Sequence, residues 1–267
     1  MAFRPPGQRP ALQRSSHSEV IAVFAAMQSE VSVCLQWAKE VRSSEVDGLR
    51  LSETDGMVVC QTGIGPRSRD AAESVVSRIS PGVVLSIGVA GGLSPKHAVG
   101  DVILCERIDH ESHRGGERED SVFSDPRLVE AALAAGKGLK LPIAKGSSLT
   151  VDEAAWGPAE KAEHHSWRAH DLAEMESYWI GEVAARHNLP FLAIRSISDH
   201  AGDELIKTGA VGLDGNFHGD RLIAYVREHP DQATAIAAQG EAARSAFNNL
   251  AILCAALLPP LVQHFAG

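Results

Sequence analysis

Short, continuously apolar segments recur along this chain, and most are followed by a stretch whose composition suits a helix. The apolar segments lie at 20–26, 57–61, 83–87, 100–105 and 191–197. A run that is apolar at consecutive positions is typical of a strand covered on both faces. We predict helices at 27–41, 67–79, 126–136 and 175–187, and a further strand at 144–150. This alternation predicts the α/β fold class with a largely parallel or mixed sheet.

The length of 267 residues suits one large α/β domain or two small ones, and the sequence has no clear boundary. We therefore predict one domain over 20–267 with a mostly helical C-terminal extension from 219 onward. Residues 1–19 place arginines among prolines, glutamines and serines, which predicts a disordered tail rather than a signal peptide. The polar segment 108–125 and the glycine-rich segment 209–219 are expected to be loops.

Composition and charge exclude several classes of function. The net charge of −9 argues against nucleic-acid binding, because that binding needs a basic face. The longest apolar run, 250–262, is broken by Pro259-Pro260 and is too short to span a bilayer, so we expect no integral membrane segment. The four cysteines are scattered without a CxxC pair, which indicates reduced thiols, a cytoplasmic protein and no zinc site. We expect no metal and no cofactor.

Two acidic residues come from different predicted elements and are expected to meet at one edge of the sheet. Glu176 lies near the start of a predicted helix, and Asp199 follows the apolar segment 191–197. Ligand sites of α/β sheets lie at the carboxyl ends of strands, where the glycine-bearing turns 62–66 and 88–93 are also expected. Two carboxylates in one pocket suit a reaction that builds positive charge on a sugar while protonating a leaving group. The competing interpretation is that Asp199 only caps a helix that follows its strand.

Six segments, taken together and in order, resemble the purine nucleoside phosphorylase and nucleosidase superfamily. They are Ala26-Met27-Gln28-Ser29-Glu30-Val31, Thr62-Gly63-Ile64-Gly65, Gly88-Val89-Ala90-Gly91-Gly92-Leu93-Ser94-Pro95, Gly100-Asp101, Glu174-Met175-Glu176 and Arg195-Ser196-Ile197-Ser198-Asp199. In layout the chain is most similar to the methylthioadenosine/S-adenosylhomocysteine nucleosidases. The resemblance implies a three-layer αβα fold around a central mixed sheet and an enzyme that cleaves an N-glycosidic bond.

The resemblance also implies roles for the matching positions. Asp199 corresponds to the acid that protonates N7 of the departing purine. Glu176 corresponds to the carboxylate that binds the ribose hydroxyls, with Met175 packed against the sugar. Glu30 corresponds to the residue that positions and activates the attacking water.

Further matching positions are expected to support these groups and to bind the substrate. Arg195 and Ser198 resemble residues placed around the water and the acid. The segment 150–155, with Asp152, is expected to line the purine base. Gly88, Val89 and Ala90 complete the expected substrate-binding set.

The sequence departs from the phosphorylases of this superfamily where they hold phosphate. The turn that matches their phosphate site has no arginine and has Val89 where a hydroxyl is expected, and no arginine lies near Glu30. These departures favour water as the acceptor and hydrolysis of an adenine nucleoside with a 5′ substituent. The alternative is phosphorolysis of a lipid-linked adenosine, because the turn 88–93 and the helical tail also resemble the hopanoid-associated phosphorylases. A catalytically silent nucleoside-binding sensor is the alternative from another class.

The family resemblance implies a homodimer, because loops corresponding to 108–125 often cross a dimer interface. Five histidines, His110, His113, His164, His165 and His170, lie in polar segments without a defensible ligand geometry, and we expect them at the surface. Alternatively, His110 or His113 approaches the pocket of a neighbouring subunit.

Overall fold

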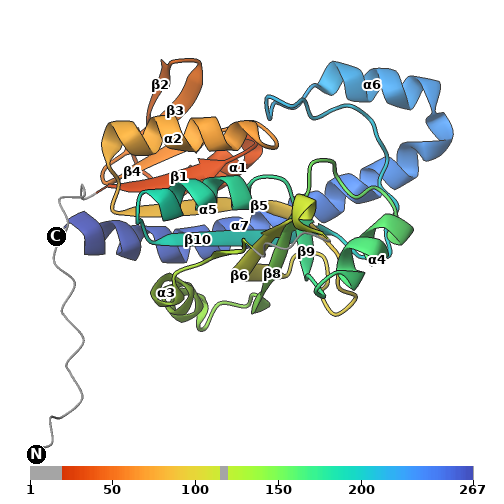
Figure 1. Cartoon of the computed structure of the whole chain (residues 1–267). Coiled ribbons are helices and arrows are strands. Elements are labelled where there is room, and N and C mark those ends of the chain that lie inside the picture. Colours follow the sequence, from red (N-terminus) through yellow and green to blue (C-terminus); the bar gives the residue numbers. More distant parts are fainter. Residues whose placement is uncertain (1–19, 115–119, 267) are drawn as a thin grey trace, which may run out of the picture.

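The computed structural model describes residues 20–114 and 120–266 (Figure 1). Its strands are β1 (Ile21–Ala25), β2 (Arg42–Val46), β3 (Leu49–Thr54), β4 (Met57–Gln61), β5 (Val83–Gly92), β6 (Val102–His110), β7 (Val122–Phe123), β8 (Ile143–Thr150), β9 (Leu172–Glu174) and β10 (Phe191–Asp199). Its α-helices are α1 (Gln28–Leu35), α2 (Arg67–Ile79), α3 (Pro126–Gly136), α4 (Pro158–Ser166), α5 (Ser177–Arg186), α6 (Gly219–Glu228) and α7 (Ala233–Ala266). The predicted disordered tail at 1–19 and part of the predicted loop, 115–119, lie outside the described residues.

The strands form one mixed sheet in the order β10-β6-β8-β9-β5-β1-β4-β3-β2, with β7 beside β6. β1 lies parallel to both β4 and β5, whereas β6 and β10 are antiparallel to each other. β10 also pairs in parallel with β5, so the strands from β5 to β10 close on themselves. This closure brings the carboxyl ends of β5, β9 and β10 to one place.

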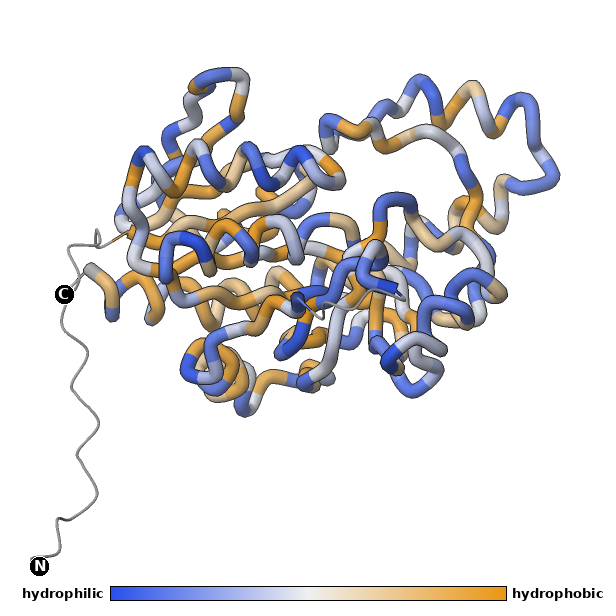
Figure 2. Tube along the Cα trace, in the orientation of Figure 1, coloured by the Kyte–Doolittle hydropathy of each residue, from blue (hydrophilic) through white to orange (hydrophobic). Residues whose placement is uncertain are grey.

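Helices cover both faces of the sheet. Because successive side chains of a strand point to opposite faces, each strand contributes to both helical layers. Ile21, Val23 and Ala25 of β1 pack in the cluster formed with α1, α3 and α7, whereas Ala22 and Phe24 pack in the cluster formed with α2 and α5. Hydrophobic residues are concentrated along the central strands (Figure 2). The predicted α/β fold with a central mixed sheet between helical layers is confirmed.

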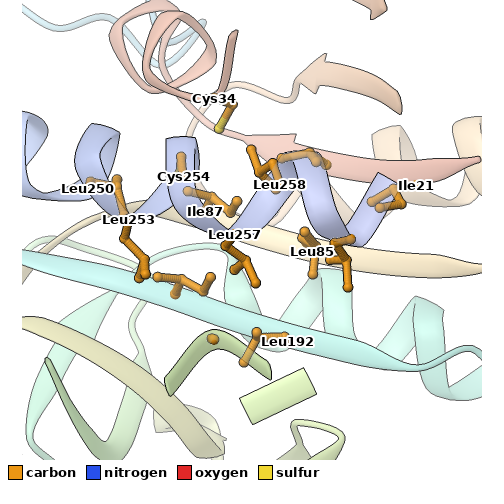
Figure 3. Packing of buried hydrophobic residues seen from close by; sticks show 14 of the residues in the cluster. Ile21, Cys34, Leu85, Ile87, Leu192, Leu250, Leu253, Cys254, Leu257 and Leu258 are labelled. Carbon is orange, nitrogen blue, oxygen red and sulfur yellow. The ribbon is translucent and has the colours of Figure 1, made fainter. Parts of the chain in front are cut away.

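α7 is part of the core. Leu250, Leu253, Leu257 and Leu258 are buried against the sheet and against Cys34 of α1 (Figure 3). The helix continues through Pro259-Pro260, although proline removes helical hydrogen bonds, because apolar side chains on both sides of the pair are buried. The prolines interrupt the apolar run of the sequence but not the helix, which agrees with the predicted mostly helical C-terminal extension.

The helical segment Pro230–Phe265 is long and apolar enough to cross a membrane by length and composition. From the sequence, we exclude a membrane span because the apolar run 250–262 is too short. The helix itself is long enough, so length does not exclude a membrane span. Half of its most apolar window is buried inside the fold.

Three elements differ in extent from the prediction. The predicted helix 27–41 ends at Leu35, and a hairpin of β2 and β3 follows. β5 continues to Gly92, so the predicted turn at 88–93 is largely strand, paired with β10 and β9. β6 continues to His110 into the predicted loop, where Asp109 pairs with the buried His170 and His110 lies beside Asp152.

Candidate active site

A cavity of about 320 Å³ opens at the shared carboxyl end of the central strands. This volume lies at the low end of the range of roughly 300–1,000 Å³ that is usual for small-molecule sites. The lining combines acidic groups with a mostly apolar wall. The acidic groups are Glu30, Glu174, Glu176 and Asp199, and the apolar wall includes Met27, Ile64, Val89, Ala90, Leu93, Val151, Ala154, Ala155, Met175, Leu205 and Val211.

Glu30 lies in the first turn of α1 and is 3% exposed. The backbone N–H groups of Met27 and Val89 each donate to one of its carboxylate oxygens, both at 2.9 Å. Burial raises the pKa of Glu30, and the Arg195 charge and these hydrogen bonds oppose the rise. A Cβ on Gly88 would lie 2.4 Å from Glu30 Oε1, so glycine is needed here for close approach rather than for a turn.

Glu176 immediately precedes α5, and its Oε1 accepts a hydrogen bond from the Gly65 N–H at 2.9 Å. Gly65 has φ +83°, a left-handed conformation that favours glycine and aims its N–H at the cavity. Burial and the neighbouring Glu174 charge raise the pKa of Glu176 to about 8. Glu176 therefore keeps its proton near neutral pH and can both donate and accept hydrogen bonds.

Arg195 lies behind the cavity wall, where it is 2% exposed and holds Glu174. Its Nη2 donates to Glu174 Oε2 and to Ser86 Oγ, both at 2.9 Å, and lies 3.9 Å from Glu176 Oε2. Burial raises the pKa of Glu174, but the Arg195 charge and several hydrogen bonds outweigh it and lower that pKa overall. The backbone N–H groups of Glu176 and Ser177 also donate to Glu174, so the buried pair fixes the start of α5.

Asp199 is the last residue of β10, and both it and Ser198 line the cavity. Consecutive strand residues normally point to opposite faces, but a register irregularity between Ile197 and Asp199 breaks that alternation. Ser198 Oγ lies 2.8 Å from Asp199 Oδ2 and 3.1 Å from Ala90 O. No helix follows Asp199 in the described segment 200–218, so the competing interpretation of Asp199 as a helix cap is wrong.

Lys161 of α4 also forms part of the cavity wall, although its side chain is fully buried. Its Nζ donates to Asp199 Oδ1 at 2.5 Å, to His200 O at 2.9 Å and to Asp203 O at 3.1 Å. The structure thus places a cation directly on the predicted acid. Sequence reasoning missed this residue, because α4 has the composition of a polar surface helix and lysine is rarely fully buried.

The predicted site residues are thus brought together, except Asp152. Asp152 is absent from the described lining: its side chain is 60% exposed and lies 3.3 Å from His110 Nε2. Its neighbours Val151, Ala154 and Ala155 line the cavity instead. Glu174 was also missed as a lining carboxylate, although it belongs to the same short motif as Glu176.

The expected surface location is wrong for three of the five histidines. His110, His164 and His170 are buried. His170 Nε2 lies 2.7 Å from Asp109 Oδ2, and His110 packs against Trp179 with ring centroids 4.4 Å apart. Polar partners inside the fold offset the cost of burying these rings.

Comparisons with known proteins show which family this chain is similar to. The family model of the Phosphorylase superfamily matches residues 20–227. The 5′-methylthioadenosine/S-adenosylhomocysteine nucleosidases of Tolumonas auensis and Anoxybacillus flavithermus are 27% and 28% identical over 201 and 204 residues, and each match covers 69% of this chain and 87% of the relative.

Solved structures show the same fold at lower identity. The Neisseria meningitidis 5′-methylthioadenosine/S-adenosylhomocysteine nucleosidase in complex with methylthio-immucillin-A has a TM-score of 0.70 and 20% identity, covering 91% of this chain and 99% of that one. The futalosine hydrolase of Helicobacter pylori has a TM-score of 0.66 and 16% identity, covering 87% and 96%. The predicted enzyme class, nucleosidases and nucleoside phosphorylases, is confirmed. With its family match extending from β1 into α6, this chain belongs to the Phosphorylase superfamily.

Proposed function

We propose that this protein hydrolyses the N-glycosidic bond of an adenine nucleoside that carries a 5′ substituent. Relatives named as nucleosidases for methylthioadenosine and S-adenosylhomocysteine support this substrate class. The cavity, with its acidic groups on a mostly apolar wall, suits a purine and a sugar bearing developing positive charge.

The observation that carries the proposal is the shortage of free donors for phosphate. Among the described lining residues the cation is Lys161, and its three N–H groups already meet Asp199 and two carbonyl oxygens. The Val89 N–H already donates to Glu30. A phosphate dianion here would lie among acidic side chains while the Lys161 and Val89 N–H groups are already engaged, which disfavours phosphorolysis.

In this proposal, Asp199 protonates N7 of the purine while the C1′–N9 bond breaks, and the bonding electrons leave with the purine. Ser198 suits both states of the acid. Its hydroxyl donates to Asp199 Oδ2 when the carboxylate is ionised, and to Ala90 O when the acid donates to it.

Glu30 and Glu176 act on the sugar side. Glu30 is held by two backbone N–H groups; it positions the water that attacks C1′ and accepts the proton that this water loses. Glu176 exchanges hydrogen bonds with the ribose hydroxyls, with Met175 beside it in the lining. As the sugar becomes cationic, the surrounding carboxylates stabilise it more strongly than they stabilise the substrate.

The experiment that tests the function is adenine release from methylthioadenosine and S-adenosylhomocysteine, with inosine as the hypoxanthine-releasing comparison. We expect adenine release at the same rate with and without phosphate. Release that requires phosphate would instead support the phosphorylase alternative. Tight nucleoside binding without any release would support a silent sensor.

A further inference from the structure

The most unusual feature of the cavity wall is the buried ammonium of Lys161. An ammonium buried without partners is costly, and this one is matched by three acceptors at 2.5–3.1 Å. Two of the acceptors are backbone carbonyls of the turn that follows β10, and the third is the Asp199 carboxylate. Lys161 therefore connects α4 both to this turn and to the proposed acid.

Its contacts leave one carboxylate oxygen for chemistry. Lys161 occupies Asp199 Oδ1, so the Oδ2 atom, beside Ser198, is the one that can carry the transferable proton. Gly91 leaves room for this orientation, because a Cβ there would lie 3.1 Å from Asp199 Oδ1.

The charge of Lys161 matters after the proton has left. Once the Oδ2–H bond breaks and the N7–H bond forms, Asp199 becomes a buried carboxylate in the cavity wall. A buried anion is unfavourable unless a cation compensates it. The ammonium 2.5 Å away provides that compensation.

We propose that Lys161 is a positioning residue for proton transfer: it fixes Asp199 Oδ1 and stabilises the carboxylate that remains after the purine is protonated. This inference rests on the proposed function, because it acts only through the acid role of Asp199. It assigns Lys161 an effect on leaving-group protonation and no direct contact with the substrate.

The test compares two substrates on each enzyme preparation: the adenine nucleoside, and the 4-nitrophenyl glycoside of the same 5′-substituted ribose, whose leaving group needs no proton. In Lys161→Met we expect kcat for the nucleoside to fall at least about 10²-fold, as for loss of one preorganised electrostatic contact. We expect kcat for the nitrophenyl glycoside to change less than about 3-fold. Lys161→Arg, which retains a cation, should recover part of the nucleoside rate. The double variant with Asp199→Asn should be no slower than Asp199→Asn alone, because both changes remove the same step.

The ratio of the two rates does not depend on how much of a preparation is folded, so a destabilised Lys161→Met protein still gives an answer. If Lys161→Met yields no folded protein, the same ratio in Lys161→Arg decides. Asp203→Asn is the matched control: it weakens the turn's own bond to the His200 N–H but keeps the Asp203 carbonyl, and should leave the ratio unchanged. Equal losses on both substrates would show that Lys161 is only a structural tether and would overturn the proposal, as would no loss on either. If the wild-type protein cleaves neither substrate, the proposed function itself fails.

Discussion

Replacing Glu176 with glutamine is expected to increase the stability of the protein and to lower its catalytic activity. The pKa of this buried carboxyl is raised from 4.5 to about 8, chiefly by burial and then by the Glu174 charge. Below pH 4.5 the group is protonated in both the folded and the unfolded chain, and it has no effect on stability. Between pH 4.5 and about 8 the unfolded chain ionises while the folded protein keeps the proton, so the folded state loses stability as pH rises.

The size of the effect follows from this interval. At about 1.4 kcal/mol for each pH unit, the cost to folding at pH 8 reaches as much as about 5 kcal/mol. Glutamine keeps the acceptor for the Gly65 N–H but places an amide near Arg195, which lies 3.9 Å from Oε2. We therefore expect Glu176→Gln to recover about 2 kcal/mol of the free energy of unfolding at pH 8, within the usual range of stabilising substitutions.

Urea denaturation of the wild type and of Glu176→Gln, at pH 5 and at pH 8, measures this difference. The gain should be small at pH 5 and larger at pH 8, whereas Glu40→Gln, at an exposed position, should show little gain at either pH. Adenine release by Glu176→Gln should fall, because an amide replaces the O–H donor and the acceptor oxygen that the protonated carboxyl presents to the ribose hydroxyls. An equal gain in the free energy of unfolding at both pH values, or a loss of stability at pH 8, would refute the assignment of Glu176 as a buried carboxyl that destabilises the fold.

Three further outcomes are expected. Asp199→Asn should lower the rate of adenine release, measured by steady-state kinetics, by roughly 10²–10⁴-fold. Its effect on substrate binding, measured by calorimetry, should be much smaller. A full rate in the folded variant would exclude the acid role of Asp199. Gly88→Ala should lower kcat/KM by about 10²-fold, because its Cβ would displace the Glu30 carboxylate. The control is Gly240→Ala, since Gly240 has open space around it. Equal kcat/KM values for the two variants would show that Gly88 is not needed for the close approach of Glu30. Light scattering should show a homodimer, and an active monomer would disprove it.

Most of the site was predictable because its groups lie in short contiguous motifs next to apolar strands. Glu30, Glu176, Ser198 and Asp199 line one cavity as predicted. Lys161 was not predictable from a single sequence, because its helix has polar composition and only the tertiary fold places its ammonium on Asp199. The cytoplasmic location stays a prediction.

The errors in the fold arise where local pattern and tertiary pairing disagree. The extension of β5 through Gly88 was missed because glycine normally signals a turn, whereas here it allows close packing of Glu30. The β2–β3 hairpin has a local signal that was overlooked, since Asp47-Gly48 has positive φ at both positions, as tight hairpin turns require. The extension of β6 to His110 has no such signal, because its polar residues find partners only in the folded chain.

The identity of the sugar product tests the central claim most directly. The protein is incubated with methylthioadenosine in the presence of excess phosphate, and the products are identified by NMR. We predict adenine and the free 5-methylthioribose, because Lys161 and the Val89 N–H in the described lining are already engaged and Glu30 lies where it can position water. Formation of the sugar 1-phosphate would contradict the hydrolytic mechanism and show that phosphate is the acceptor.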